Sequence, residues 1–259
     1  MRFIRTFNEG FTGVIVLDND EKHNSLNRQM LGEIEQALGL FEKENLRSVI
    51  IRSNPGKKVW CAGLRIDELP DPEKDPVPYE YPLERTLRKV EDYPGAVIAM
   101  IEGSVWGGGC ELAFSCDILI GSPFSTFAIT PARLNAPYNP VQVQRVLSLV
   151  ETNIAKELFF TAAPIKAERA LELGILNHLV ETKRLESFTM QMAEKINANA
   201  PQSIRLLKRE INSISRNRIA GLQNSEEIRG LVKELYYSRD FAEGKRAFLE
   251  KRKPDFRGQ

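Results

Sequence analysis

The feature that most constrains this chain is an apolar run that leads into three consecutive glycines, in residues 96–117 (AVIAMIEGSVWGGGCELAFSCD). Its first six residues are apolar, three of them β-branched, and they are too few for an ordinary helix, so we expect a buried strand. After the glycines, Cys110, Ala113 and Phe114 have the spacing of a helix that is buried on one face. The stretch therefore predicts a strand, a glycine-rich turn and a helix.

The glycine-rich turn at Gly107–Gly109 has the chemistry of an anion or oxyanion site. The first N–H groups of a helix are unpaired, and glycine lets a ligand approach the backbone closely. Glu111 falls in the first turn of the predicted helix. A tight turn between packed elements needs the same glycines, and a carboxylate at that place often only complements the helix dipole. The spacing is that of neither common phosphate-binding loop, so both interpretations stay open.

A second stretch of this kind precedes the first. Residues 47–53 predict a buried strand, and the small residues Ala62 and Gly63 then lead into an amphipathic segment. Repeated strand–loop–helix units predict an α/β fold with its loops at the carboxyl ends of parallel strands. The N–H groups of Leu64 and Gly108 are then placed to converge on one oxygen, which is what acyl chemistry requires.

Turn residues and apolar periodicity predict the remaining elements. Further strands are expected at 3–6, 14–18, 117–121, 126–130 and 175–180, with a turn at 8–10 between the first two. Helices are expected at 30–41, 83–91, 151–160, 166–173 and 184–197, from Pro201 onward, and in two final segments whose apolar faces need a partner. Residues 70–82 hold five prolines and predict a surface loop, and residues 130–140 (TPARLNAPYNP) predict irregular backbone.

Composition excludes several classes of function. The chain has 259 residues, enough for a large core, and 36 basic against 35 acidic side chains, so no net field would attract nucleic acid or a membrane surface. The three cysteines lie in apolar stretches without metal-ligand spacing, which is typical of reduced core residues. There is no apolar run of membrane-spanning length and no signal-peptide core, so we expect a cytoplasmic protein.

Four ordered motifs resemble the crotonase (enoyl-CoA hydratase/isomerase) superfamily: WCAGLRIDEL, EGSVWGGGCELAFSCD, AAPIKAERALELGILNHLV and EGKRAFLEKRKPDF. The resemblance covers essentially the whole chain. It implies a spiral of ββα units over residues 1–195, a helical trimerisation region over residues 196–259, and trimers or hexamers. It also implies an acyl-CoA substrate and an oxyanion hole made by the N–H groups of Leu64 and Gly108.

Within this superfamily the chain is most similar to the biotin-independent methylmalonyl-CoA decarboxylases. Hydratases carry two catalytic glutamates, one matching Glu111 and the other matching Pro131, and a proline cannot act as a base. In the decarboxylase subgroup, the residues that match Thr130 and Tyr138 lie by the substrate carboxylate. One departure is Leu64, where the subgroup has a histidine, and this departure bears on substrate choice.

The resemblance also implies residues that bind the CoA substrate. Lys22 and Lys253 would meet the CoA phosphates, and Trp106 would line the acyl pocket. Ala62, Gly107 and Pro131 are the other residues expected to contact the substrate. Without the resemblance, the basic residues would be solvated surface and Trp106 would be core.

The resulting hypothesis is a carboxy-lyase that releases CO₂ from methylmalonyl-CoA, or a close 2-substituted malonyl-CoA, through an enolate, with neither biotin nor a metal. Glu111 is either the proton donor to the enolate or a structural residue, and Tyr138 is either functional or a core tyrosine. The alternatives are another crotonase reaction (enoyl-CoA isomerisation or hydration, or thioester hydrolysis) and a non-catalytic CoA-binding member. A scaffold that binds RNA is disfavoured by the balanced charge.

Overall fold

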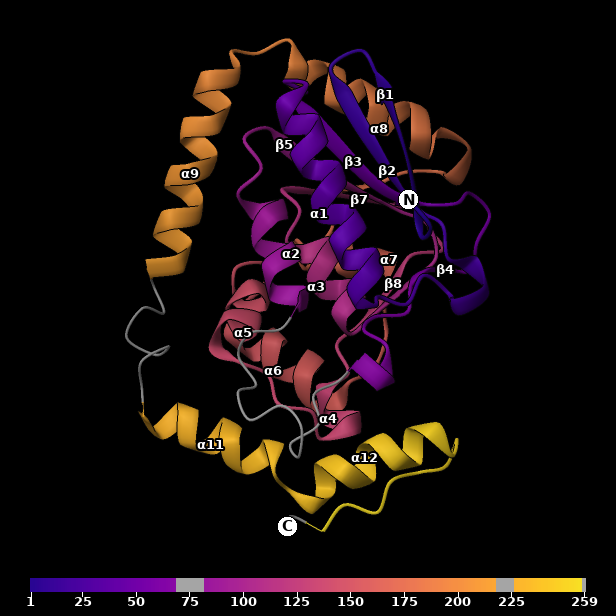
Figure 1. Ribbon diagram of the computed structural model, residues 1–259, viewed down its shortest axis with the longest axis vertical. Helices are drawn as coiled ribbons and strands as arrows, with labels where there is room; N and C mark the ends of the chain where they lie inside the picture. Colours follow the sequence, from indigo (N-terminus) through magenta and orange to yellow (C-terminus); the bar gives the residue numbers. More distant parts are fainter. Residues whose placement is uncertain (69–81, 218–225, 258–259) are drawn as a thin grey trace.

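The computed structural model describes residues 1–68, 82–217 and 226–257, which form two β-sheets and the helices around them (Figure 1). The first sheet has the order β1 (Ile4–Glu9), β2 (Thr12–Leu17), β3 (Ser48–Ser53), β5 (Ala96–Ile101), β7 (Ile118–Gly121) and β10 (His178–Leu179). The second has the order β4 (Val59–Cys61), β6 (Ser104–Trp106), β8 (Thr126–Ala128) and β9 (Ile165–Lys166). Neighbouring strands are parallel except in the pairs β1–β2 and β8–β9.

Helices follow most strands and then dominate the second half of the chain. The first half holds the 3-10 turns η1 (Asp20–Lys22) and η2 (Ile66–Glu68) and the helices α1 (Arg28–Lys43), α2 (Pro82–Glu91), α3 (Gly108–Phe114) and α4 (Pro131–Leu134). The second half holds α5 (Pro140–Leu147), α6 (Thr152–Thr161), α7 (Ala167–Glu172), α8 (Thr182–Asn197), α9 (Pro201–Asn217), α11 (Glu226–Tyr236) and α12 (Arg239–Leu249).

The chain order and the strand order together describe a spiral. Three successive units, β3–β4–α2, β5–β6–α3 and β7–β8–α4, each add one strand to the first sheet and one to the second. The predicted α/β fold, a spiral of ββα units with a helical C-terminal region, is confirmed. The central stretch behaves as predicted, with β5 and α3 on either side of the glycine-rich turn.

Several local predictions are wrong. The segment at 130–140 is not irregular throughout, because Pro131 begins α4 and Pro140 begins α5. Proline suits the first helical position, where its missing N–H costs no hydrogen bond. The first hairpin turns later than predicted, since Glu9 still pairs with Thr12. The strand at 175–180 shrinks to His178–Leu179, because the chain before it is bonded to the end of α7. The proline-rich loop lies outside the described residues, apart from Pro82 at the start of α2.

Side chains alternate between the two faces of a strand, and in β2, β3 and β5, at the centre of the first sheet, both faces are buried. One face packs against α1, α2, α3 and the second sheet, with Ile15, Leu17, Ile51, Val97 and Ile101 pointing inward. The other face packs against α8, with Val14, Val16, Ile50, Ile98 and Met100 pointing toward it. Burial of both faces explains the nearly continuous apolar runs in β3 and β5.

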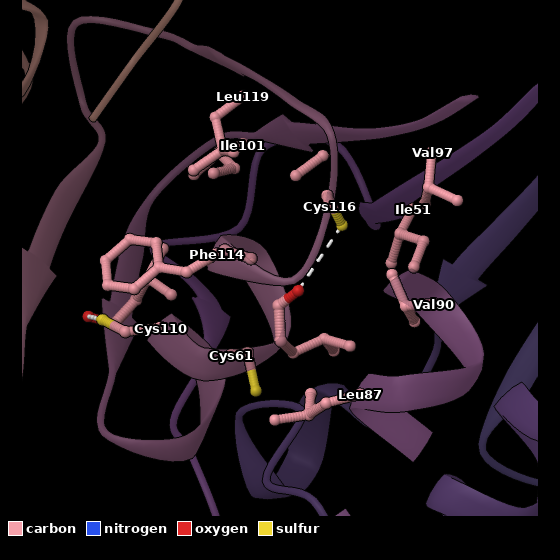
Figure 2. Packing of buried hydrophobic residues seen from close by; sticks show 14 of the residues in the cluster. Ile51, Cys61, Leu87, Val90, Val97, Ile101, Cys110, Phe114, Cys116 and Leu119 are labelled. Carbon is pink, nitrogen blue, oxygen red and sulfur yellow. Dashed lines mark hydrogen bonds between the residues drawn. The ribbon is translucent and has the colours of Figure 1, made fainter. Parts of the chain in front are cut away.

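The three cysteines lie in this core, as predicted. Figure 2 shows Cys61, Cys110 and Cys116 among aliphatic and aromatic side chains around α3. All three are free and buried. Burial raises the pKa of the Cys61 thiol to about 12, so the thiol stays protonated and unreactive at neutral pH.

Candidate active site

The glycine-rich turn places the start of α3 beside the second sheet. Gly107 precedes the helix with φ 47° and ψ −117°, a conformation that strongly favours glycine. Its N–H donates to the carbonyl of Ala128, 2.8 Å away, which fixes the turn against β8. The helix therefore begins at a defined position, with its first N–H groups directed out of the protein core.

The loop after β4 meets this turn at close range. A β-carbon on Gly63 would lie 2.5 Å from the Trp106 carbonyl oxygen, and one on Gly108 would lie 3.1 Å from the Leu64 nitrogen. The β4 loop is held by an isolated parallel bridge between Leu26 and Leu64. Neither the Leu64 N–H nor the Gly108 N–H has an acceptor within the described ranges of the chain. Two unpaired donors from separate loops thus lie close together.

A cavity of about 150 Å³ opens at these two donors. It is lined by eight of the residues predicted from the sequence: Ala62, Leu64, Gly107, Gly108, Glu111, Thr130, Pro131 and Tyr138. Three predicted residues, Lys22, Trp106 and Lys253, do not line it. Lys22 is exposed and adjoins His23, whose carbonyl accepts the Ala62 N–H over 2.9 Å, so it lies near the rim. Lys253 is exposed beyond α12.

Glu111 is the buried carboxyl group of this cavity, with 5% of the residue exposed. Both of its oxygens lie 3.0 Å from the Nε2 atom of Gln142, which donates to them. Arg145 approaches to 3.9 Å. Burial raises the pKa of Glu111 above its ordinary value, although Arg145 and Gln142 act in the opposite direction. A neutral Glu111 would not repel an anionic substrate.

Tyr138 lies across the cavity from the glycine-rich turn and packs edge-on against Phe159, with ring centroids 5.6 Å apart. Its hydroxyl is buried and makes no well-formed hydrogen bond in the described part of the chain, but it interacts with the Glu111 carboxyl group. Burial, and then the charge of Glu111, raise the pKa of Tyr138 well above its ordinary value. The group is therefore a neutral donor held close to Glu111.

A buried ion-pair network lies behind Glu111. The Arg145 guanidinium donates to both oxygens of Glu84, over 2.8 and 2.9 Å, and to Glu91 over 2.6 Å. Glu91 also pairs with Arg216 of α9 over 2.8 Å. The network links the cavity to α9 and fixes the positive charge that faces Glu111.

The cavity lining also includes residues that sequence reasoning missed, among them Glu84, Gln142 and Phe248. A signal for Gln142 was available, because asparagine followed three residues later by glutamine is the pattern of a capping box. Phe248 reaches the cavity only because α12 packs against α4, a contact between segments far apart in the chain. No local pattern predicts that contact.

Within residues 1–68, 82–217 and 226–257, no group of three or more histidine, cysteine or acidic side chains is arranged to hold a metal ion. None of the helices described in these ranges is long and apolar enough to span a membrane.

Comparisons with known proteins agree with the geometry. Residues 8–259 match the family model described as enoyl-CoA hydratase/isomerase. The chain is 41% identical over 245 residues to methylmalonyl-CoA decarboxylase of Escherichia coli (strain K12), covering 95% of this chain and 94% of the relative. It is 32% identical over 247 residues to short-chain-enoyl-CoA hydratase of Clostridium acetobutylicum, covering 95% and 94%.

Solved structures give the same result. A methylmalonyl-CoA decarboxylase in complex with 2-nitronate-propionyl-CoA superposes with a TM-score of 0.94 at 40% identity, covering 100% of this chain and 99% of the other. A methylmalonyl-CoA decarboxylase complexed with 2S-carboxypropyl CoA has a TM-score of 0.95 at 40% identity, with the same coverage.

Proposed function

This chain belongs to the enoyl-CoA hydratase/isomerase family, and from that membership we propose that it is a carboxy-lyase that releases CO₂ from methylmalonyl-CoA or a close 2-substituted malonyl-CoA. The observation that carries the proposal is the meeting of the Leu64 and Gly108 main chains at a cavity where, among the described lining residues, Glu111 is the one carboxyl group without an ion pair closer than 3.9 Å. The similarity to two decarboxylase complexes with CoA thioesters supports it.

The proposed reaction begins with the thioester carbonyl between the N–H groups of Leu64 and Gly108. The bond between the α-carbon and the carboxylate breaks, CO₂ leaves, and the electron pair forms a thioester enolate. Donors aimed at an oxygen that becomes negative only as the bond breaks stabilise the transition state more than the substrate. This step needs neither biotin nor a metal, because the two N–H groups receive the developing charge.

Tyr138 and Thr130 are proposed to receive the substrate carboxylate. The Tyr138 hydroxyl is a buried donor without a well-formed hydrogen bond in the described residues, and the Thr130 hydroxyl oxygen lies 3.2 Å from where a β-carbon on Gly107 would be. Holding the carboxylate perpendicular to the carbonyl plane lets the breaking bond overlap with the forming enolate. Leu64, Pro131 and Leu134 keep this end of the cavity apolar, which stabilises a carboxylate less than water does.

Glu111 is proposed to protonate the α-carbon of the enolate. Burial raises the pKa of the Glu111 carboxyl group, which favours its protonated form and so its role as a proton donor. A net proton is consumed in each turnover, giving the decarboxylated acyl-CoA and CO₂, and Glu111 is then reprotonated.

Hydration by two carboxylates is disfavoured by the same cavity. Pro131 cannot ionise, and the second carboxylate present, Glu84, accepts two hydrogen bonds from Arg145. A base held in this way is poorly placed to activate water. Isomerisation and thioester hydrolysis would need Glu111 to act as a base, and so need its ionised form, which burial disfavours.

We further propose how the substrate binds, where the enzyme acts and how the chain assembles. Lys22 and Lys253 would contact the CoA phosphates, Ala62 and Trp106 would lie along the bound thioester, and the enzyme would act in the cytoplasm. Residues 1–195 would form the catalytic spiral, and residues 196–259 would assemble the chain into trimers or hexamers. Exposed apolar residues in the second region, among them Leu207, Ile211 and Ile214, support the assembly.

The proposal is tested by measuring CO₂ release from malonyl-, methylmalonyl- and ethylmalonyl-CoA, with crotonyl-CoA as the hydration substrate. We expect CO₂ from methylmalonyl-CoA and little hydration. In Gly108→Ala the new methyl group lies 3.1 Å from the Leu64 nitrogen, so CO₂ release should fall on the order of 10²–10³-fold. Gly39→Ala, in open space on α1, is the matched control and should keep full activity.

No CO₂ from any malonyl thioester would contradict the proposal. Hydration of crotonyl-CoA would then select the hydratase alternative, and thioester binding without turnover would select the non-catalytic one. Equal activity in Gly108→Ala and Gly39→Ala would remove the two main-chain donors from the mechanism.

A further inference from the structure

Gln142 carries no role in the reaction described above, yet its side-chain amide donates to both oxygens of Glu111 over 3.0 Å. We infer that Gln142 is a positioning residue, whose amide, oriented by the main chain of Asn139, holds the Glu111 carboxyl group in one orientation and stabilises its ionised form. The inference about Gln142 rests on geometry alone, and only the kinetic consequence rests on the proposed function.

The orientation of the Gln142 amide follows from a capping box at the start of α5. The Asn139 N–H donates to Oε1 of Gln142 over 2.8 Å, and the Gln142 N–H donates to Oδ1 of Asn139 over 3.0 Å. An amide oxygen only accepts, so the first bond fixes which end of the side chain faces the backbone. The Nε2 group then faces Glu111, 3.0 Å from both oxygens. Turning the amide over would lose both interactions.

The charged groups around Glu111 are paired with other residues or carry the same charge, so stabilising an ionised Glu111 depends on neutral donors. Arg145, from α5, lies 3.9 Å away and is committed to Glu84 and Glu91 at 2.6–2.9 Å. Glu84, from α2, disfavours a charge on Glu111, and the other titratable groups beside it are the Cys110 thiol and the Tyr138 hydroxyl, of which the hydroxyl favours that charge. Gln142, a neutral donor at hydrogen-bond distance from both oxygens, thus helps to offset the burial of an ionised Glu111.

The contact with Gln142 affects how readily Glu111 loses and regains a proton. Protonation of an enolate carbon leaves Glu111 ionised in a buried site, where the charge is costly without a hydrogen-bond donor. The Gln142 amide meets that charge without adding a net positive charge beside the substrate. Removing the donor should keep Glu111 protonated to higher pH.

Two variants separate this role from helix capping. Gln142→Met loses the donor to Glu111 without adding a charge, whereas Gln142→Glu keeps an acceptor for the Asn139 N–H but places a second carboxyl group beside Glu111, which raises its pKa as well. The matched control is Gln144→Glu on the same helix, since the Gln144 amide donates to Ser215 and not to Glu111. The titration of Glu111 is followed by infrared difference spectra of the carboxyl stretch, each variant against the same variant carrying Glu111→Gln. The pH profile of CO₂ release is recorded in parallel.

We expect the Glu111 midpoint to move upward by about one pH unit or more in both Gln142 variants, the size expected for a lost hydrogen bond to a charged group. If Glu111 is the proton donor, activity is lost as Glu111 ionises, so the alkaline limb of the profile should move upward equally. Gln144→Glu should move neither.

An unchanged midpoint in Gln142→Met, together with reduced thermal stability of that variant, would make Gln142 a capping residue only and overturn the inference. A shifted midpoint with an unmoved alkaline limb would support the inference and instead remove Glu111 as the proton donor. The infrared titration needs no substrate, so it tests Gln142 even if the chain releases no CO₂.

Discussion

The hydroxyl of Tyr138 is buried and makes no well-formed hydrogen bond in the described residues, and such a group costs a fold about 1–3 kcal/mol. We predict that Tyr138→Phe leaves the melting temperature unchanged or higher, because no well-formed hydrogen bond of the fold is lost. CO₂ release should fall by about 10–100-fold, the value of a hydrogen bond to a charged group. Thermal unfolding and turnover measured on the same preparation test both parts.

Tyr93 provides the matched control for this prediction. Its hydroxyl is also buried but donates to the Leu46 carbonyl over 2.8 Å, away from the cavity. Tyr93→Phe should therefore lower stability by about 1 kcal/mol and leave turnover intact. The reverse pattern, with Tyr138→Phe destabilised and fully active, would make Tyr138 a structural residue.

Glu111 should make the protein less stable as pH rises. Its pKa is higher in the folded protein than in the unfolded chain, so its stabilising contribution is complete below the ordinary carboxyl pKa. That contribution is lost as pH rises through the folded value. We predict that the melting temperature of Glu111→Gln, relative to the wild type, increases between pH 4 and pH 8. A difference that stays constant across this range would contradict the raised pKa.

At the scale of elements, the contact between α12 and α4 completes the cavity, because it brings Phe248 to the wall. A β-carbon on Gly244 would lie 2.1 Å from the Leu134 carbonyl oxygen, so the two helices meet backbone to backbone. We predict that Gly244→Ala displaces α12, raises KM for the acyl-CoA more than it lowers kcat, and speeds proteolysis of the C-terminal segment.

Gly230 in α11 is the control for this element, since a β-carbon there meets nothing within 4 Å. Gly230→Ala should keep KM and resist proteolysis at least as well as the wild type, because alanine favours helix by about 1 kcal/mol over glycine. An unchanged KM in Gly244→Ala would mean that α12 does not shape the binding site.

Local sequence patterns predicted some of the helices and strands and missed others. The strand β5 and the helix α3 were predicted from an apolar run and from the glycines between them. Both elements are almost fully buried, so their sequences carry a clear apolar pattern. The short helix α4 was missed because its prolines suggest irregular chain, although Pro131 occupies the first helical turn. A four-residue helix is too short to show a helical period in the sequence. In the fold it packs against α12, a contact that the local sequence does not reveal.

At the scale of the molecule, the predicted site depends on loops brought together by the spiral. Leu64 and Gly108 were expected to meet because successive units place their loops at the same edge of the sheets, and their close approach is observed. Gln142 and Arg145 come from α5, after the spiral, and contact Glu111 through tertiary packing that no spacing in the sequence encodes. Motifs therefore predicted residues that line the cavity better than the residues that support them.

The single chain exposes apolar side chains on α9. On α9, Leu207, Ile211 and Ile214 lie at helical spacing and are 56%, 64% and 63% exposed. Covering such side chains is worth about 1.5–3 kcal/mol each when it is complete. We predict that the protein sediments as three or six copies of the 29.4 kDa chain, and that Ile211→Asp with Ile214→Asp dissociates it. Leu40→Asp, which changes an exposed leucine of α1, should leave the assembly intact. A wild-type protein that sediments as a single chain at micromolar concentration would show that α9 is covered in some other way, and the assigned trimerisation region would lose its support.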